Sequence, residues 1–398
     1  YLCQEFVQLY MKQGENTLDI NKTGKTSLKN IIIFAGAYCA FMIGSGYATG
    51  QEVLQFFGAY GPDGFIGAAI SMVIFAFFGG ALMQKGYDLK LKYHTQAFRY
   101  YCGKYVGTIL EWVTVLFLFS VVSIMIAGTG AIASEFVGIP ADAGRVFMAV
   151  LCVLTVMLGL MKLADIIGAI GPVIILFTLG IGLMTLISFH GGWAQNWEVL
   201  YDLRATKSWW FAKYAFLDSA WFSGVLYASC MVFGSIPFLT GLGGKANNRK
   251  EAFLGGFCGG VALMLAGGLM TAAMLCFPEQ VAKLQVPNLF LAQQFAPALA
   301  AVFSVILLLG IYSTGAPMFW VVINKLEQWL PNKTAKMAVS VILGIVAFFG
   351  AQIGFGKLIG FLYPLLGQIG IIMIIIVFIK VYFMKDKEID LEREDSDN

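Results

Sequence analysis

Ten long apolar runs, separated by short polar segments, constrain this 398-residue chain more than any other feature. A run of about 18 apolar residues is long enough to cross a bilayer as a helix. Composition agrees, because 59% of the residues are hydrophobic and only 12% are charged, whereas a soluble domain carries about 25% charged residues. We therefore expect an all-α membrane protein with ten transmembrane helices. The runs are residues 31–57, 64–84, 107–136, 145–161, 166–189, 217–240, 252–276, 291–323, 336–350 and 356–383.

Basic residues are unevenly distributed among the segments that link these runs. If the N-terminus is cytoplasmic, the segments on that side hold 20 Lys and Arg residues and the opposite segments hold 6. Cytoplasmic segments of membrane proteins carry such an excess, so we expect both termini in the cytoplasm. Two stretches are expected at the membrane surface. One is the Trp-rich loop at 190–216, and the other is the basic, aromatic Asp88–Lys104, which we expect to form a short amphipathic helix. The expected divisions are a cytoplasmic tail at 1–30, a five-helix set at 31–189, an extracellular loop at 190–216, a second five-helix set at 217–384 and a cytoplasmic tail at 385–398.

Several functional classes find no support in the residues. A net charge of +3 leaves no nucleic-acid footprint. The seven cysteines show no Cys-x-x-Cys spacing and the two histidines lie far apart, so we expect neither a structural metal nor an organic cofactor. No cluster of catalytic side chains and no phosphate-binding loop indicates an enzyme. The expected partners are a small-molecule substrate and the lipid bilayer, with the chain acting as a monomer or a homodimer.

The first apolar run contains three glycines within seven residues, at Gly44, Gly46 and Gly50. Each glycine costs a helix about 1 kcal/mol relative to alanine. Either these small residues allow close helix packing, or the run is unwound into two half-helices whose freed backbone groups bind a ligand. Gln51 and Glu52 favour the second interpretation, because an ionisable residue inside a membrane segment is costly and functional by default. A wet vestibule or an ion pair would also accommodate Glu52.

The sixth run is also rich in small and polar residues. It carries Ala228-Ser229-Cys230 about twelve residues from its start, and Pro237 removes one helical hydrogen bond. Inverted-repeat transporters place discontinuous helices at corresponding positions of their two halves. We therefore predict a second break at Ala228–Cys230, corresponding to Gly44–Gly46 in the first run, although the two segments share little sequence.

This layout resembles the amino acid–polyamine–organocation superfamily, and specifically the neurotransmitter:sodium symporter fold of two inverted five-helix repeats with broken helices 1 and 6. The first-run motif resembles that of the YkvI-like bacterial membrane proteins. The resemblance covers residues 30–384 and is most specific in this motif. It implies a multi-pass protein of the bacterial plasma membrane. The motif reads Gly44-Ser45-Gly46-Tyr47-Ala48-Thr49-Gly50-Gln51-Glu52, followed by Leu54-Gln55-Phe56-Phe57.

The resemblance also implies a sodium site between the first and eighth helices. Carried over by position, the ligands are carbonyls of the first helix together with a carbonyl and two adjacent hydroxyls of the eighth. Na⁺ is a hard cation that oxygen ligands suit, and the fifth helix holds no Lys or Arg to replace it. The alternative is that each hydroxyl merely bonds a carbonyl of its own helix. The implied ligands are Ala40, Ile43, Gly310, Ser313 and Thr314.

The substrate site is expected near the membrane midplane, between the two breaks, with the third and eighth helices as its walls. Gly128, with Gly130, makes room either for substrate or for a closely packed helix. Glu52 lies six residues past Gly46, nearly two helical turns outward, so we expect it in a gate or a proton path. No Asp or Glu lies at either expected break. A protein that binds strongly basic amines would more often carry an acidic residue there. The expected substrate-binding residues are Gly44, Ser45, Gly46, Tyr47, Ser123, Gly128, Ala228, Ser229 and Cys230.

The sequence thus favours a secondary active transporter that moves a small amino acid or amine by alternating access, coupled to Na⁺. Two alternatives stay open. One is a proton-coupled transporter that uses Glu52, and the other is a membrane sensor that keeps the fold without transport.

Overall fold

The computed structural model describes residues 26–90, 96–158, 164–189, 217–327 and 332–382, together with residues 198, 202, 329 and 330. Within these residues every regular element is helical, as the apolar runs predict. Residues 1–25 of the expected N-terminal tail, most of the expected loop at 190–216 and the expected C-terminal tail at 385–398 lie outside the described residues.

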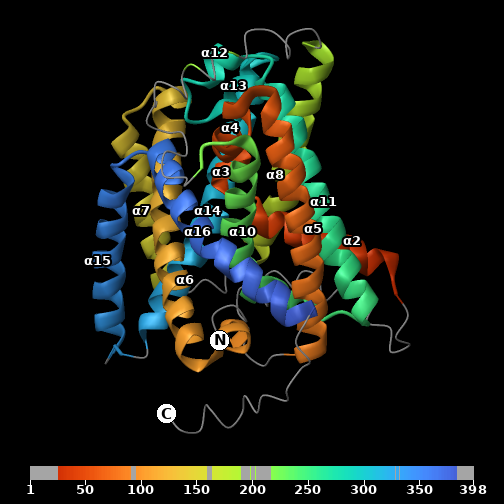
Figure 1. The fold of residues 1–398 in the computed structure, drawn as a ribbon. Coiled ribbons are helices and arrows are strands. Elements are labelled where there is room, and N and C mark those ends of the chain that lie inside the picture. Colours follow the sequence, from red (N-terminus) through yellow and green to blue (C-terminus); the bar gives the residue numbers. More distant parts are fainter. Residues whose placement is uncertain are drawn as a thin grey trace.

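The first half of the chain contains both long helices and short helical segments (Figure 1). They are α2 (Leu28–Met42), α3 (Ser45–Thr49), α4 (Gln51–Phe56), the 3₁₀ segment η1 (Gly58–Asp63), α5 (Gly64–Leu89), α6 (Gln96–Ile132), the π-helical segment η2 (Ala133–Val137), α7 (Ala141–Leu158) and α8 (Ala164–Ser188). Those of the second half are α10 (Ala220–Gly243), α11 (Arg249–Met274), α12 (Pro278–Val281), α13 (Pro287–Gln293), α14 (Pro297–Glu327), α15 (Lys333–Ala351) and α16 (Phe355–Tyr382).

Seven of the described helical segments are long and apolar enough to cross a membrane, and two shorter apolar segments lie at Leu28–Met42 and Val173–Ser188. Boundaries differ from the prediction where proline or glycine intervenes. The predicted run 291–323 begins inside α13, because Pro297 starts α14 as a separate helix. The described part of the predicted surface helix Asp88–Lys104 continues into α6, which leaves helical geometry at Gly103 (φ 76°).

The predicted break at Ala228–Cys230 is absent, because α10 runs without interruption from Ala220 to Gly243. Its small residues instead allow close packing against α5 and α16. A Cβ on Gly224 would lie 2.7 Å from the Gly67 backbone, and one on Gly370 would lie 2.5 Å from the Ser229 carbonyl carbon. A helix enclosed this tightly keeps its backbone hydrogen bonds, because unwinding would bury unpaired polar groups.

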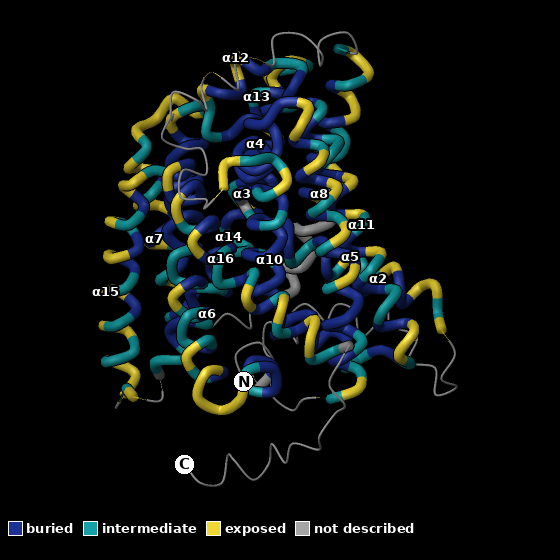
Figure 2. The backbone as a smooth tube through the Cα atoms, in the orientation of Figure 1, coloured by how far each residue is buried: buried dark blue, intermediate teal, exposed yellow. Residues whose placement is uncertain are grey.

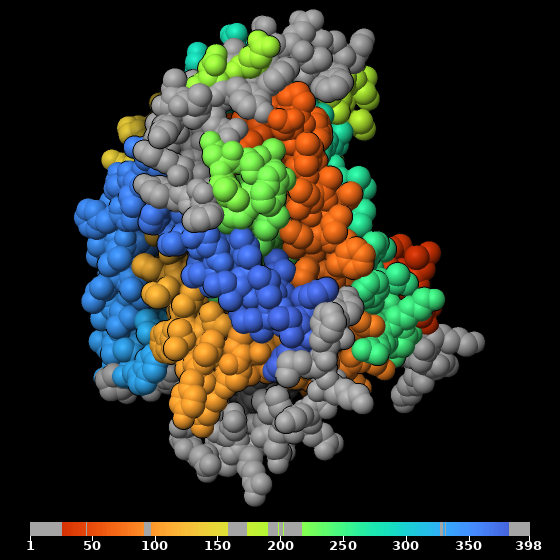
Figure 3. Space-filling model, viewed as in Figure 1, coloured from red at the N-terminus to blue at the C-terminus, as the bar shows by residue number. Residues whose placement is uncertain are grey.

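The short helices α3 and α4 form the centre of the bundle. Figure 2 shows them as a buried segment, whereas the outlying α15 is largely exposed. α3 contacts α6, α8, α13 and α14, and α4 contacts α10, α11 and α16. Figure 3 shows one face of this enclosure. There α10 (green) lies between α16 (blue) and α5 (orange), and it contacts both. A polar group on α3 or α4 is therefore held away from lipid.

Candidate functional site

The first span is interrupted twice near its middle. α2 ends at Met42, Ile43 and Gly44 are not helical, and α3 begins at Ser45. Five residues later Gly50 adopts the left-handed conformation (φ 86°, ψ −3°) between α3 and α4. Glycine suits this backbone, which a Cβ would strain, and a Cβ on Gly50 would also meet the Asn288 side chain. The two glycine positions thus turn one apolar run into three short pieces.

The turn at Gly50 brings Glu52 back to the interruption. A Cβ on Gly46 would lie 2.6 Å from the Glu52 carboxyl carbon and 2.7 Å from its Cγ, so the acidic side chain occupies the space above the glycine. Glu52 is only 2% exposed. The expectation that Glu52 lies two turns outward is therefore wrong, because it assumed that one continuous helix joins the two residues.

Two tyrosines from distant helices donate hydrogen bonds to this carboxylate. The hydroxyl of Tyr227 on α10 lies 2.9 Å from Oε2, and that of Tyr363 on α16 lies 2.9 Å from Oε1. Within the described part of the chain, no Lys, Arg or His forms an ion pair with Glu52. A buried carboxylate without a basic partner is costly when ionised, so this position calls for a bound cation or a proton.

The two tyrosines that bond Glu52 are packed among other aromatic rings. The Phe56 ring centroid lies 5.2 Å from that of Tyr227 and 6.3 Å from that of Tyr363. Phe57 and Phe75 meet the Tyr227 ring edge-on at 5.4 and 5.9 Å. All five side chains are buried. The hydroxyl groups directed at Glu52 therefore come from a buried aromatic cluster.

Side chains also fix the backbone of α3. The Thr49 hydroxyl donates to the Gly46 carbonyl at 3.1 Å. The Asn288 amide, from α13, donates to the Ala48 carbonyl at 2.8 Å. The start of α13 is held in turn by Glu135, whose carboxylate accepts hydrogen bonds from the backbone N–H groups of Gln285 and Val286 at 3.0 to 3.2 Å. The segment with α12 and α13 is therefore fastened directly to the interrupted span.

The other predicted substrate residues lie on several sides of α3. Gly44 has the Met125 side chain nearest to its Cβ position, at 3.9 Å. Ser123 points toward α15, with its hydroxyl 2.9 Å from the Cβ position of Gly350. A Cβ on Gly128 would lie 3.1 Å from the Phe355 ring, in keeping with the packing alternative.

On α10 the predicted positions are fully buried beside the site. Ala228, Ser229 and Cys230 are all 0% exposed, and the Ser229 hydroxyl has no hydrogen-bond partner among the described residues. Tyr47 is also buried and donates to the Leu263 carbonyl at 2.6 Å. The backbone of Ser45 begins α3, and its side chain lies outside the described residues.

The implied sodium ligands of the eighth helix lie together on α14. The Ser313 hydroxyl donates to the Gly310 carbonyl at 2.8 Å, which is the local bond weighed as the alternative. A Cβ on Gly310 would lie 3.3 Å from Ile174 Cγ1, so this glycine packs against α8. Among the described residues, no hydrogen bond links Ala40 or Ile43 to α14. The sodium set therefore stays a prediction.

Sequence reasoning missed Tyr227 and Tyr363. Tyr227 directly precedes the predicted Ala228–Cys230 segment, but its ring was indistinguishable from the many packing aromatics of a membrane protein. Tyr363 comes from the last span, which no motif linked to the first. Only the packing of α10 and α16 against α4 reveals them.

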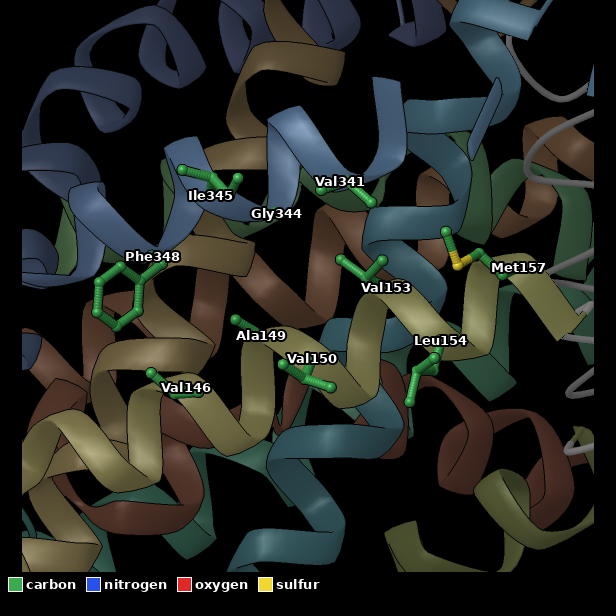
Figure 4. A pocket seen from close by; sticks show the side chains of 10 residues that line it. All are labelled: Val146, Ala149, Val150, Val153, Leu154, Met157, Val341, Gly344, Ile345 and Phe348. Carbon is green, nitrogen blue, oxygen red and sulfur yellow. The ribbon is translucent and has the colours of Figure 1, made fainter. Parts of the chain in front are cut away.

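A separate apolar groove lies between α7 and α15 (Figure 4), with a volume of about 430 Å³. Its lining is hydrocarbon and thioether apart from the Gly344 backbone, so no side chain could orient a polar solute. We place no solute site there. The lining residues are Val146, Ala149, Val150, Val153, Leu154, Met157, Val341, Gly344, Ile345 and Phe348.

Comparison with known proteins places the chain among membrane proteins, although no family model matches it. It is 23% identical over 340 residues to the uncharacterized membrane protein YkvI of Bacillus subtilis strain 168, covering 85% of this chain and 93% of the relative. It is 22% identical over 352 residues to the uncharacterized protein YyaD of the same strain, covering 88% and 96% of the two chains.

Three solved structures share the fold. MhsT in complex with L-phenylalanine gives a TM-score of 0.54 at 13% identity, covering 89% of this chain and 99% of that one. The Eremococcus coleocola manganese transporter with a bound aromatic bis-isothiourea compound gives 0.51 at 13%, with 95% and 94% covered. A substrate-bound Na⁺-coupled sialic acid symporter gives 0.51 at 13%, with 96% and 87% covered. Two of these neighbours are named as a transporter and a symporter, and this chain resembles the membrane protein YkvI in sequence and has the fold of the three solved structures.

Proposed function

We propose that this protein is a secondary active transporter that moves a small amino acid or amine across the bacterial plasma membrane by alternating access. The observation that carries this proposal is the buried Glu52 carboxylate lying over Gly46, at the interruption of a membrane-spanning helix. Interrupted helices in transporters line the substrate site with backbone groups. An ionisable residue kept at such a depth is costly, and it is retained where it serves binding. The transporters among the solved structures of the same fold support this assignment.

We propose ten membrane spans in two inverted five-helix sets, at 31–189 and 217–384, with both termini in the cytoplasm. The long described helices, the shorter apolar ones and α7 support the count. The excess of basic residues on one side supports the orientation. Because α10 is continuous, the two sets differ within the described residues: the first span is interrupted and the sixth is not.

Na⁺ is the proposed coupling ion, held by the carbonyls of Ala40, Ile43 and Gly310 and the hydroxyls of Ser313 and Thr314. One fact supports it: the helix that carries Gly310, Ser313 and Thr314, α14, contacts α3 of the first span.

Proton coupling through Glu52 is the second candidate. It is favoured by the same carboxylate, which no basic side chain of the described residues pairs with and which a proton would neutralise. The titratable groups that face it are Tyr227 and Tyr363, with Tyr47 and Cys230 within electrostatic reach.

Uptake into proteoliposomes tests the proposal. Purified protein is reconstituted and given labelled amino acids and amines with an inward Na⁺ gradient, an inward proton gradient or neither. We expect accumulation above the external concentration with one ion gradient only, and no accumulation for Gly46→Leu, which fills the space above the interruption. Ligand binding without accumulation under any gradient would instead identify a sensor.

A further inference from the structure

The charge of Glu52 limits what the site can bind. The side chain is 2% exposed, and each of its two oxygens accepts one tyrosine hydroxyl at 2.9 Å. An ionised carboxylate accepts about four hydrogen bonds, so roughly half of its capacity remains available. Donors that carry no charge do not balance a buried negative charge. A ligand that completes this site brings N–H groups and a positive charge.

Building on the proposed function, we propose that the substrate is an organic amine that binds as a cation through Glu52 and carries no carboxylate of its own. This choice separates amines from zwitterionic amino acids, two classes that the proposed function leaves together.

Among the described residues, the position at Gly46 is unsuited to a substrate carboxylate. The space above the Gly46 backbone, where an exposed interruption would receive one, is filled by the Glu52 side chain. The hydroxyls of Tyr227 and Tyr363, which could bind an anion, both donate to Glu52 instead. A second carboxylate beside the first would be repelled, because two like charges at one site disfavour each other. The protein has thus placed its own carboxylate in that position.

The surrounding rings suit a cation with an apolar body. Phe56 packs against both tyrosines that bond the carboxylate, with its ring centroid 5.2 Å from that of Tyr227 and 6.3 Å from that of Tyr363. Aromatic faces attract an ammonium group and are most effective when water is excluded. They also bury a hydrocarbon chain without demanding further hydrogen bonds. The site therefore combines one charge-specific contact with apolar walls.

Matched ligand pairs test this assignment in the purified full-length protein. Each amine is compared with the amino acid of which it is the decarboxylated form: phenethylamine with L-phenylalanine, ethanolamine with L-serine, and putrescine with L-ornithine. Binding is measured by thermal stabilisation in detergent and by competition between the members of a pair. We expect at least one amine to bind at least tenfold more tightly than its amino acid.

Two variants show whether Glu52 carries the preference. Glu52→Gln keeps the size of the side chain and removes the charge, and it should weaken amine binding at least tenfold while leaving amino acid binding little changed. Glu279→Gln removes an exposed carboxylate on α12 and should change neither. If Glu52→Gln fails to fold, Tyr363→Phe leaves the charge in place and should keep the preference for the amine.

The outcomes separate this inference from the proposed function. Amino acids that bind as tightly as their amines, or a panel in which no amine binds, would overturn the inference. An amine that binds but is never accumulated in vesicles would refute the transporter and leave the cation site standing. Accumulation of an amino acid without its amine would support the transporter and refute the cation site.

Discussion

The Glu52 carboxylate lies directly above Gly46, although the two residues are six positions apart in an apolar span. Its carboxyl carbon is 2.6 Å from the position that a Cβ on residue 46 would occupy. The left-handed Gly50 between them ends α3 and redirects α4, so the acidic side chain returns to the interruption it follows in sequence. The site is therefore a product of two glycines, one that turns the chain and one that leaves room for the carboxylate.

The first prediction concerns the space at Gly46. Gly46→Ala places a methyl group against the Glu52 side chain, which must then move from its two tyrosines. Overpacking of this kind costs about 1–3 kcal/mol, so ligand affinity should fall by about 5- to 150-fold. Gly36→Ala is the matched control, because nothing lies within 4 Å of its Cβ position. Equal affinities of the two variants, measured by ligand binding, would show that Gly46 is not part of the site.

The second prediction concerns the two tyrosine hydroxyls. Tyr363→Phe removes one donor from a buried carboxylate, and hydrogen bonds to charged groups contribute about 1.5–3 kcal/mol. We expect a lower thermal unfolding temperature, and a smaller decrease when Glu52→Gln is already present. Such coupling is measured by a double-mutant cycle.

Tyr38→Phe provides the control for that cycle, since its hydroxyl donates to the Phe75 carbonyl at 3.3 Å and not to Glu52. Its effect on the unfolding temperature should be the same with and without Glu52→Gln. If Tyr363→Phe behaves like Tyr38→Phe in both backgrounds, the Glu52–Tyr363 hydrogen bond makes no contribution of its own.

Local patterns were enough to predict the helical membrane class and to single out the glycine-rich motif of the first span. Apolar length and glycine spacing act within one segment, so they can be read without a partner helix. The position of Glu52 could not be read in this way. Counting turns assumes a continuous helix, and the handedness of one residue, Gly50, decides where the side chain points.

The sixth span shows a prediction that local patterns made wrongly, namely the break at Ala228–Cys230. Ala228, Ser229 and Cys230 are as compatible with an unwound segment as with a tightly packed helix, because small residues serve both. The neighbours decide between them: Gly370 of α16 approaches the Ser229 backbone, and this contact requires a regular, closely packed helix. Tyr363 was likewise inaccessible to pattern analysis, because its role depends on α16 packing beside α4.

The third prediction concerns the segment with α12 and α13. Asn288→Ala removes the hydrogen bond to the Ala48 carbonyl. A neutral hydrogen bond contributes about 0.5–1.5 kcal/mol net. The fraction of molecules in which the segment with α12 and α13 has moved away from α3 should therefore rise about 2- to 10-fold. Cys230 is fully buried beside the site, and its rate of modification by a maleimide reports this opening when the other cysteines are replaced.

Gln280→Ala is the comparison for this experiment, because Gln280 is an exposed residue of the same segment. Its modification rate should match that of the parent protein. An Asn288→Ala rate that also matches the parent would mean that this hydrogen bond does not hold the segment closed.

The fourth prediction tests the sodium set through its hydroxyls. Ser313→Ala with Thr314→Ala removes two of the five proposed oxygen ligands, and Na⁺ has no covalent preference that could compensate for their loss. Stimulation of uptake by Na⁺ should disappear, while binding measured without Na⁺ should persist because Glu52 is untouched. Ser304→Ala is the control on the same helix, since its hydroxyl makes an equivalent local bond to the Ala301 carbonyl at 2.8 Å. If the double variant retains full Na⁺ stimulation, Ser313 serves only its bond to Gly310, and coupling must be sought at Glu52.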